Sequence, residues 1–299
     1  MRIGVDLGGT KIEALALDPT GHAVYRQRIP APQGDYRATI EAVAGLVELA
    51  EQTLGSKGSV GIGIPGAISP KTRLIKHANS TWITGHPFER DMAARLGRPV
   101  RFANDADCFA LSEATDGAGA GARVVFGAIL GTGVGGGIVV EGRPLAGPNA
   151  IAGEWGHNPL PWPRDEERPG PQCYCGKTGC IETFLSGPGL ARDYATATGA
   201  RLPAAAVAQR IDAKEPTALA ALERYLDRLA RSLATVVNLI DPDVIVLGGG
   251  VSNIAALYEP LPGRLADHVF SKEPVATRIV RARFGDSSGV RGAAWLWPA

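Results

Sequence analysis

One local pattern occurs twice in the 299-residue chain, and it limits the folds that the chain can adopt. Residues 2–7 (RIGVDL) form a short β-rich run, the turn GGTK interrupts it, and IEALALD follows as a second strand. Residues 124–142 repeat this plan with VVFGAIL, GTGVGGG and IVVEG. Aliphatic and β-branched runs on both sides of a glycine-rich turn predict two joined strands. We therefore expect an α/β protein with two similar domains, each contributing one glycine-rich hairpin to a shared cleft.

Both glycine-rich turns are candidate phosphate-binding sites. Gly8 and Gly9 expose backbone N–H groups, Thr10 adds a hydroxyl and Lys11 adds a positive charge, and such a set can hold a phosphate. The turn lacks the spacing of a Walker loop or of a dinucleotide-binding fingerprint. Taken alone, a Gly-Gly turn is usually a simple hairpin. The second copy at 131–137 makes both turns more convincing as phosphate-binding sites than either would be alone.

The segments between and after the hairpins complete an α/β pattern. Apolar residues at helical spacing predict amphipathic helices at 36–54 and 217–240. Residues 60–69 predict a buried strand that runs into a Pro-Gly turn. The predicted strand at 98–104 ends in Asn104 and is followed by Asp105, and α/β folds place their ligands at such strand ends.

Two further segments leave alternatives open. The strand at 244–247 runs into GGGVS, which we expect to open a helix. A glycine-rich turn of this kind commonly lets a nucleotide lie against the backbone, but it also serves tight packing of helix on strand. Residues 77–85 (HANSTWITG) either line a sugar site or form an ordinary surface loop.

Residues 153–182, GEWGHNPLPWPRDEERPGPQCYCGKTGCIE, contain the densest chemistry. Cys173, Cys175 and Cys180 lie within eight residues, and His157 precedes them. Three thiolates and one imidazole can form a closed tetrahedral zinc site, which indicates a structural metal. A disulfide and an uncoordinated reduced cluster are the alternatives. Glu154 and Glu182 stand at the two ends of the segment, where a metal-held loop would fix them for a hydroxyl-rich ligand such as a sugar.

Composition excludes several classes of protein. The chain is 45% hydrophobic and 20% charged, which is typical of a globular protein. Its net charge of +1, without a long basic run, argues against nucleic acid or an anionic membrane as the partner. No apolar run reaches the roughly 20 residues that cross a bilayer. The start MRIGVDLGG has no secretory pattern, so we expect a cytoplasmic protein. The fourth cysteine, Cys108, is expected to be a buried apolar residue.

The order of the motifs DLGGTK, NDAD, GTGVGGG, GEWGH, CYCGKTGC and LGGG resembles the ROK family (repressors, open reading frames and sugar kinases). The runs GEWGHNPLPWP and GDSSGVRGAAWLWP look most like those of bacterial fructokinases, also called manno(fructo)kinases. The resemblance implies the two-lobed actin-like ATPase (ribonuclease H-like) fold with a cleft between the lobes. It places the small lobe at 1–117 and the large lobe at 118–287, with a final helix at 288–299 packing back on the small lobe. It also implies a homodimer.

The resemblance implies ATP-dependent phosphorylation of a hexose at its 6-hydroxyl, with fructose as the first expectation. It assigns ATP and Mg²⁺ to Asp6, Gly8, Gly9, Thr10, Lys11, Gly131, Thr132, Gly133, Gly248, Gly249 and Gly250. It assigns the sugar to Gly66, Asn79, Asn104, Asp105, Glu154, His157 and Glu182, with Asp105 as the general base. It assigns a structural Zn²⁺ to His157, Cys173, Cys175 and Cys180. Asp107 is a rival base, since it would share the direction of Asp105 in a strand but not at a helix start.

Three alternatives remain. A glucokinase, a mannokinase or an N-acetylglucosamine kinase would use the same Asn, Asp, Glu and His set. A sugar-responsive transcriptional regulator would carry a DNA-binding segment before the first hairpin, whereas this hairpin begins at residue 2. A non-catalytic sugar-binding protein would not need Asp105 together with two phosphate-binding turns.

Overall fold

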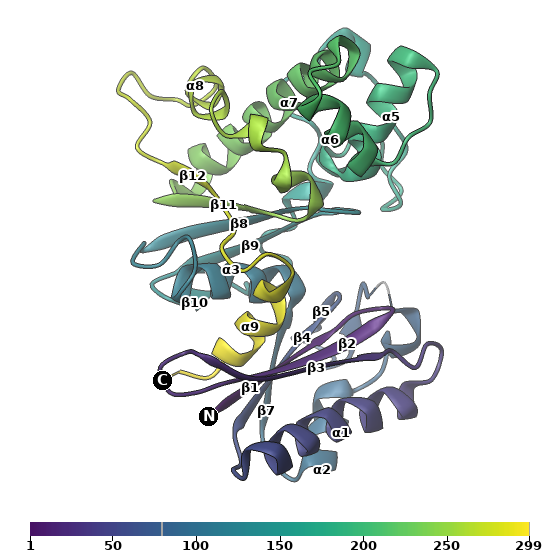
Figure 1. Ribbon diagram of the computed structural model, residues 1–299, viewed down its shortest axis with the longest axis vertical. Helices are drawn as coiled ribbons and strands as arrows, with labels where there is room; N and C mark the ends of the chain where they lie inside the picture. The colour runs from purple at the N-terminus through teal and green to yellow at the C-terminus, as the bar shows by residue number, and fades with distance from the viewer. Residues whose placement is uncertain (79, 299) are drawn as a thin grey trace. The chain divides into compact units, whose positions relative to one another are not determined.

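The computed structural model describes residues 1–78 and 80–298 and divides into two compact units (Figure 1). Unit 1 contains Met1–Gly121, Gly137–Ala152 and Asp286–Ala299, and unit 2 contains Ala122–Gly136 and Gly153–Gly285. This division differs from the sequence-based one, which gave residues 137–152 to the second lobe. They belong to unit 1 because strand β10 (Arg143–Pro144) packs on helix α3 (Asp105–Thr115).

Unit 1 contains a five-stranded sheet in the order β3-β2-β1-β4-β7. Its strands are β1 (Arg2–Leu7), β2 (Lys11–Leu17), β3 (Ala23–Pro30), β4 (Ser59–Ile64) and β7 (Val100–Asn104). β2 runs antiparallel to both β1 and β3, whereas β1, β4 and β7 are parallel. The sequence predicts all of these strands except β3. That strand lies at the sheet edge and is largely exposed, so its charged residues conceal the strand pattern.

Helices cover both faces of this sheet (Figure 1). α1 (Tyr36–Leu54) and α2 (Phe88–Leu96) pack on one face, where Ile3, Val5 and Leu7 of β1 join the core. α9 (Ser288–Trp295) packs on β1, β2 and β4 and against α3. Gly61 of β4 permits this contact, because a Cβ atom there would lie 1.9 Å from the carbonyl oxygen of Ala293. The last helix therefore packs within unit 1.

The second sheet has the order β10-β9-β8-β11-β12. Its further strands are β8 (Val124–Leu130), β9 (Val134–Val140), β11 (Val244–Gly248) and β12 (Arg278–Arg281). β8, β11 and β12 are parallel and β9 runs antiparallel to β10, so the strand arrangement of the first sheet recurs. The repeat predicted from the two glycine hairpins is thus a repeat of the whole sheet. The helix expected after β11 is the short 3-10 helix η4 (Gly250–Asn253).

Helices account for most of the remainder of unit 2. They are α4 (Ile181–Leu185), α5 (Gly187–Thr198), α6 (Ala204–Asp212), α7 (Pro216–Ile240) and α8 (Leu261–Ala266). α7 buries Leu222, Leu226, Leu229 and Leu233 and contacts the other four helices. The short elements of unit 1 include β5 (Ala67–Ile68), β6 (Ile75–Lys76) and η1 (Thr81–Ile83), and those of unit 2 include η2 (Trp155–His157), η3 (Asp165–Glu167) and η5 (Ala255–Leu257). The 3-10 helix η6 (Gly285–Ser287) lies where the two units meet in sequence.

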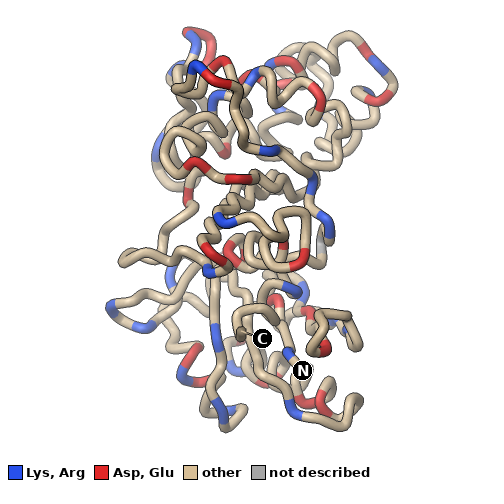
Figure 2. Tube along the Cα trace, turned by 90° about the vertical axis from the view of Figure 1, so that its left-hand side faces the viewer, with Lys and Arg blue, Asp and Glu red and all other residues tan. Residues whose placement is uncertain are grey.

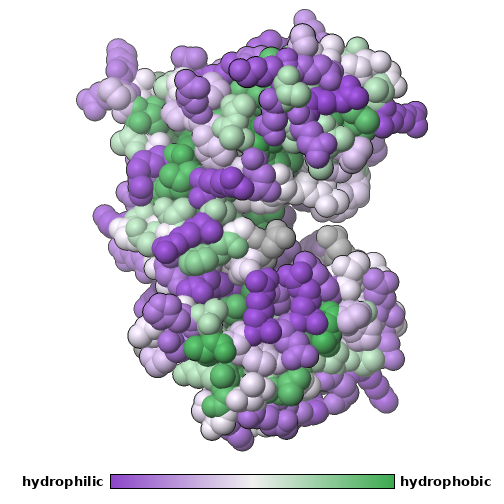
Figure 3. Space-filling model, viewed as in Figure 1, coloured by the Kyte–Doolittle hydropathy of each residue, from purple (hydrophilic) through white to green (hydrophobic). Residues whose placement is uncertain are grey.

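Charged residues of both signs are interspersed along the trace in Figure 2. Hydrophilic residues cover much of the face drawn in Figure 3, and hydrophobic residues form small groups between them. Among the described residues, no helix combines the length and apolar character that crossing a membrane requires.

Candidate functional site

In unit 1, Asn104 and Asp105 lie where β7 ends and α3 begins. Asn104 caps the helix, since its Oδ1 accepts the backbone N–H of Ala106 at 2.8 Å, and its Nδ2 donates to the carbonyl of Gly66 at 2.9 Å. Asp105 is the first residue of α3. Asp107 is in the same helix, where side chains two positions apart point in different directions. The two carboxylates therefore cannot take the same role, and Asp105 remains the candidate base.

Asp6 lies close to Asp105 and beside the first hairpin. Its burial, followed by the negative charges of Asp105 and Glu13, raises the pKa of Asp6 to about 6. The hairpin is closed by a hydrogen bond from the Gly8 N–H to the Lys11 carbonyl at 2.9 Å. Carboxylates that share a site in this way are typical of catalytic or cation-binding positions. Of the other residues predicted for unit 1, Thr10 is exposed, and Asn79 lies outside the described residues.

In unit 2, the second hairpin (Gly131–Gly133) is attached to the segment that follows the cysteines. Glu182 Oε2 accepts the backbone N–H of Val134 at 2.9 Å, and the Gly131 carbonyl accepts the N–H of Gly187 at 2.7 Å. A Cβ atom at Gly133 would lie 2.6 Å from Glu182 Oε2, so this contact requires glycine. Glu182, predicted as a sugar ligand, therefore already holds the hairpin.

The third glycine turn lies against this hairpin. Gly248 pairs with Ile129 in the sheet, and Gly249, with a φ of 81°, packs on the backbone of Leu130 and Gly131. The structure thus brings together the two glycine segments of unit 2 that the sequence assigns to the nucleotide. Thr132 at the tip of the hairpin is exposed, and Gly250 begins η4.

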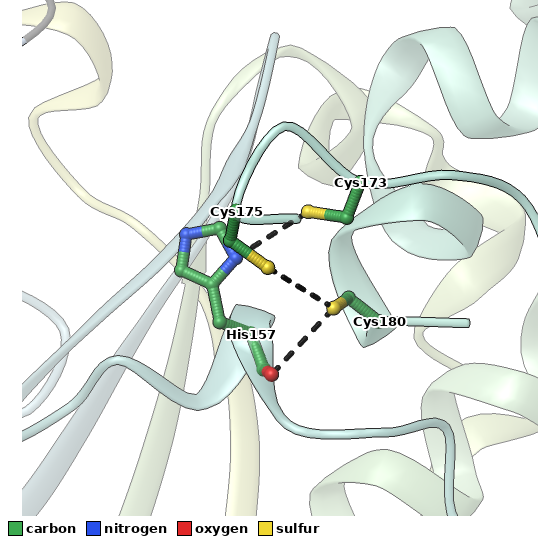
Figure 4. A group of neighbouring side chains, drawn as sticks. All are labelled: His157, Cys173, Cys175 and Cys180. Carbon is green, nitrogen blue, oxygen red and sulfur yellow. Dashed lines mark hydrogen bonds between the residues drawn. The ribbon is translucent and has the colours of Figure 1, made fainter. Parts of the chain in front are cut away.

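The four predicted metal ligands converge (Figure 4). Their donor atoms all lie within 4.8 Å of one another, with 3.6 Å between Cys173 Sγ and His157 Nδ1 and 3.6 Å between the Sγ atoms of Cys175 and Cys180. Tetrahedral zinc with Zn–S bonds of about 2.3 Å has S···S edges of about 3.7 Å, so the set fits this ion. A sulfur–sulfur bond measures about 2.05 Å, which excludes a Cys175–Cys180 disulfide in this arrangement.

Backbone hydrogen bonds shape the cysteine turn itself. The Cys173 N–H donates to the Lys177 carbonyl at 2.8 Å, and the Gly176 N–H donates to the Cys173 carbonyl at 3.1 Å. Burial raises the pKa of Cys173 and raises that of Cys180 to about 12, whereas a backbone hydrogen bond from Lys177 lowers the pKa of Cys175. A metal that binds here must therefore displace protons from thiols whose ionisation burial opposes, namely Cys173 and Cys180.

His157 uses both ring nitrogens. Nδ1 faces Cys173, and Nε2 lies 2.9 Å from the hydroxyl oxygen of Tyr174. Partial burial of that hydroxyl, then the charges of Glu182 and Glu154, raise the pKa of Tyr174 to about 12. The three predicted sugar-contacting residues of unit 2 thus lie around a residue that the sequence analysis missed. Its position between two clustered cysteines was the available signal.

The GEWGH motif is anchored by its tryptophan. Trp155 is buried, donates from Nε1 to the Gly135 carbonyl at 2.9 Å and packs edge-on against Phe126 with ring centroids 5.5 Å apart. This anchor fixes the backbone on both sides of Trp155 to β8 and β9. Glu154 is exposed and His157 is half-buried.

A buried charge cluster, which we call the arginine cluster, holds the middle of the same segment. Glu167 accepts hydrogen bonds from Arg228 at 2.7 Å and from Arg231 at 2.9 Å, and all three residues are buried. Arg231 also donates to the carbonyls of Pro161 and Trp162. Although burial raises the pKa of Glu167, hydrogen bonds from Arg228, the Arg164 backbone and Arg231 lower it overall. Sequence analysis gave no indication of this cluster.

The family model described as "ROK family" matches residues 2–299. The chain belongs to the ROK family. A crystal structure of ROK hexokinase from Thermus thermophilus has a TM-score of 0.86 and 32% identity, covering 98% of this chain and 96% of that one. A ROK family glucokinase from Streptomyces griseus, in complex with glucose and AMPPNP, has a TM-score of 0.79 and 28% identity, covering 99% and 98%. The two-lobed α/β fold that the sequence predicts is therefore confirmed.

Curated relatives bear on the sugar. N-acetyl-D-glucosamine kinases from Salmonella typhimurium and Escherichia coli O157:H7 are each 44% identical over 302 residues, covering 99% of this chain and 99% of each relative. The sequence analysis had favoured fructokinases on two motif runs. These relatives support one of its alternatives instead.

Proposed function

We propose that this chain is an ATP-dependent sugar kinase that phosphorylates the 6-hydroxyl of N-acetyl-D-glucosamine. The observation that carries this proposal is the 44% identity, over nearly the full length of both chains, to N-acetyl-D-glucosamine kinases. The glucokinase complex with glucose and AMPPNP supports a sugar and an ATP-like donor as the ligands. Fructose remains the second candidate, because the runs GEWGHNPLPWP and GDSSGVRGAAWLWP look most like those of bacterial fructokinases.

The residues suit phosphoryl transfer, which depends on alignment and charge neutralisation more than on covalent chemistry. Asp105 would accept the proton of the sugar's 6-hydroxyl as that oxygen attacks the γ-phosphorus of ATP. Lys11 and the backbone N–H groups of the two hairpins would hold the phosphates. Mg²⁺ bound with the nucleotide would supply further neutralisation, with Asp6 nearby.

The cysteine cluster would have a structural role. His157, Cys173, Cys175 and Cys180 would hold Zn²⁺ in a closed four-ligand shell, which leaves no position for a substrate. Their task would be to fix the loop that carries Glu154 and Glu182. A sugar needs such fixed carboxylates because each of its hydroxyls must meet a partner of set direction.

A panel of initial rates tests the choice of sugar. We would measure kcat/KM with ATP for N-acetyl-D-glucosamine, fructose, glucose and mannose, and locate the phosphate by NMR. N-acetyl-D-glucosamine should give the highest value, with phosphate on the 6-oxygen. A tenfold advantage for fructose would restore the fructokinase interpretation, and ATP consumption that no sugar stimulates would refute the kinase.

A further inference from the structure

Tyr174 contacts the outer side of the predicted metal ligand His157. Its hydroxyl oxygen lies 2.9 Å from His157 Nε2, and its ring meets the imidazole edge-on, with centroids 5.1 Å apart and an interplanar angle of 87°. The residue is 78% exposed, so burial of its ring does not explain this position. The hydrogen bond and the ring contact are the interactions that place it.

The two nitrogens of His157 face partners of different kinds. Nδ1 points towards the thiols and lies 3.6 Å from Cys173 Sγ, whereas Nε2 points towards the phenol. A neutral imidazole carries one proton, and the nitrogen that binds a metal must be the one without it. A metal ligand of this kind usually donates its other N–H to an oxygen, which fixes both tautomer and ring orientation.

We propose that Tyr174 is a positioning residue: its hydroxyl oxygen accepts a hydrogen bond from the His157 Nε2–H group, which keeps the proton on Nε2 and leaves the Nδ1 lone pair directed at Cys173, Cys175 and Cys180. The cysteine turn supplies the geometry, because Tyr174 stands between two of the cluster cysteines. The sulfur atoms of these cysteines face one another and the imidazole (Figure 4), whereas the Tyr174 hydroxyl meets the other ring nitrogen. This inference rests on the metal site of the proposed function.

The proposal requires that Nε2 is occupied by the phenol. A sugar hydroxyl could then reach this nitrogen only by displacing Tyr174, so sugar contact and imidazole orientation compete at one atom. His157 stays a predicted sugar contact beside Glu154 and Glu182, and its Nε2 can meet a hydroxyl once Tyr174 has moved away.

Tyr174→Phe removes the hydroxyl and keeps the ring. Nitrogen NMR of the metal-free, reduced protein should show His157 as a single Nε2–H tautomer in the parent and as a mixture in the variant. Zinc titrated against a chromophoric chelator should then bind about tenfold more weakly, the lower end of the range for loss of an outer-shell partner. Trp162→Phe, an exposed aromatic of the same segment that stacks on His268, is the matched control and should change neither readout.

An Nδ1–H tautomer in the parent, or an unchanged tautomer in Tyr174→Phe, would overturn the proposal. The same zinc dissociation constant in parent and variant would overturn it as well. If the parent bound no zinc, the proposed metal site would fail, and the tautomer measurement would still decide the role of Tyr174. Neither readout requires turnover, so absence of kinase activity is a separate result.

Discussion

Two regions present carboxylates to predicted substrates, and they hold them by different means. Asp105 is fixed by regular structure, because a strand ends and a helix capped by Asn104 begins at this point. Glu154 lies in the irregular 153–182 segment and depends on attachments made by side chains. The first arrangement is local in sequence and requires no ion. The second requires groups that are distant in sequence and, on our proposal, a metal.

The 153–182 segment itself has two attachments of unlike chemistry. The cysteine cluster consists of one imidazole and three thiols, and a bound metal ion would supply the free energy that holds them together. The arginine cluster consists of buried ion pairs that form from the chain alone. The contrast suggests that the segment keeps its middle in place when the metal is absent and loses order mainly at the cysteine turn.

The largest effect is expected at Asp105, which the cysteine cluster does not hold. Asp105→Asn keeps the shape of the side chain but removes the proton acceptor, so kcat should fall by about 10²–10⁴-fold. Sugar affinity, measured by calorimetry, should change only a few-fold, and zinc content should be unchanged. Asp107→Asn is the control, and a dead Asp107→Asn variant beside an active Asp105→Asn would show that the base is misassigned.

Breaking the arginine cluster should reduce stability more than catalysis. Glu167→Gln leaves Arg228 and Arg231 without their shared buried charge, a loss that typically costs about 3–5 kcal/mol. We expect about 3 kcal/mol, near the lower end of this range, because Asp193 still accepts from Arg228 and Asp227 from Arg231. Urea unfolding, monitored by tryptophan fluorescence, measures this loss in the free energy of unfolding. Glu166→Gln, an exposed neighbour, should have little effect, and equal midpoints for the two variants would contradict the prediction.

Removing one cysteine should disrupt the cysteine cluster without breaking the arginine cluster. Cys175→Ser should lose zinc, measured by elemental analysis of protein prepared without chelators. Because the cysteine turn carries Glu182 at its end, sugar affinity should fall more than ATP affinity. Cys108→Ala changes a buried cysteine of unit 1 and should keep its zinc. Cys175→Ser protein that retains zinc and sugar affinity would refute the structural metal.

As the pH falls, zinc should leave the cysteine cluster before the ion pairs of the arginine cluster break. Zinc must displace protons from thiols whose pKa is raised, to about 12 for Cys180, so its affinity should fall as the pH drops over the whole range below that value, neutral pH included. The pKa of Glu167 is lowered from 4.5, so its ion pairs stabilise the fold above that pH and are lost only as the pH falls further. A pH series of zinc content beside unfolding free energy tests this, and simultaneous loss would count against it.

Much of the fold could be predicted from the sequence because its signals are local. The runs RIGVDL and VVFGAIL and the apolar spacing of 36–54 correspond to β1, β8 and α1. The cluster of His157 with three cysteines was predictable for the same reason, since the cysteines lie within eight residues. The family was recognisable from the order of six short motifs, whereas two motif runs were too little to identify the sugar.

The features that were missed depend on tertiary contacts. Arg228 and Arg231 lie on the buried side of α7, and their partner Glu167 is 61 and 64 residues away in sequence. Apolar periodicity places arginine on the exposed face of a helix, so it cannot predict buried ion pairs with a distant glutamate. Tyr174 was overlooked because a hydrogen bond to His157 spans 17 residues and depends on the cysteine turn.

One contact lies between the two proposed binding sites of unit 2, the nucleotide hairpin and the cysteine cluster. Glu182 Oε1 lies 4.0 Å from Cys173 Sγ while its Oε2 holds the Val134 N–H of the second hairpin. If occupation of the hairpin and occupation of the cysteine cluster each shift this carboxylate, the two events share a coupling free energy. Linkage then requires reciprocity: the factor by which the metal changes nucleotide affinity equals the factor by which the nucleotide changes metal affinity.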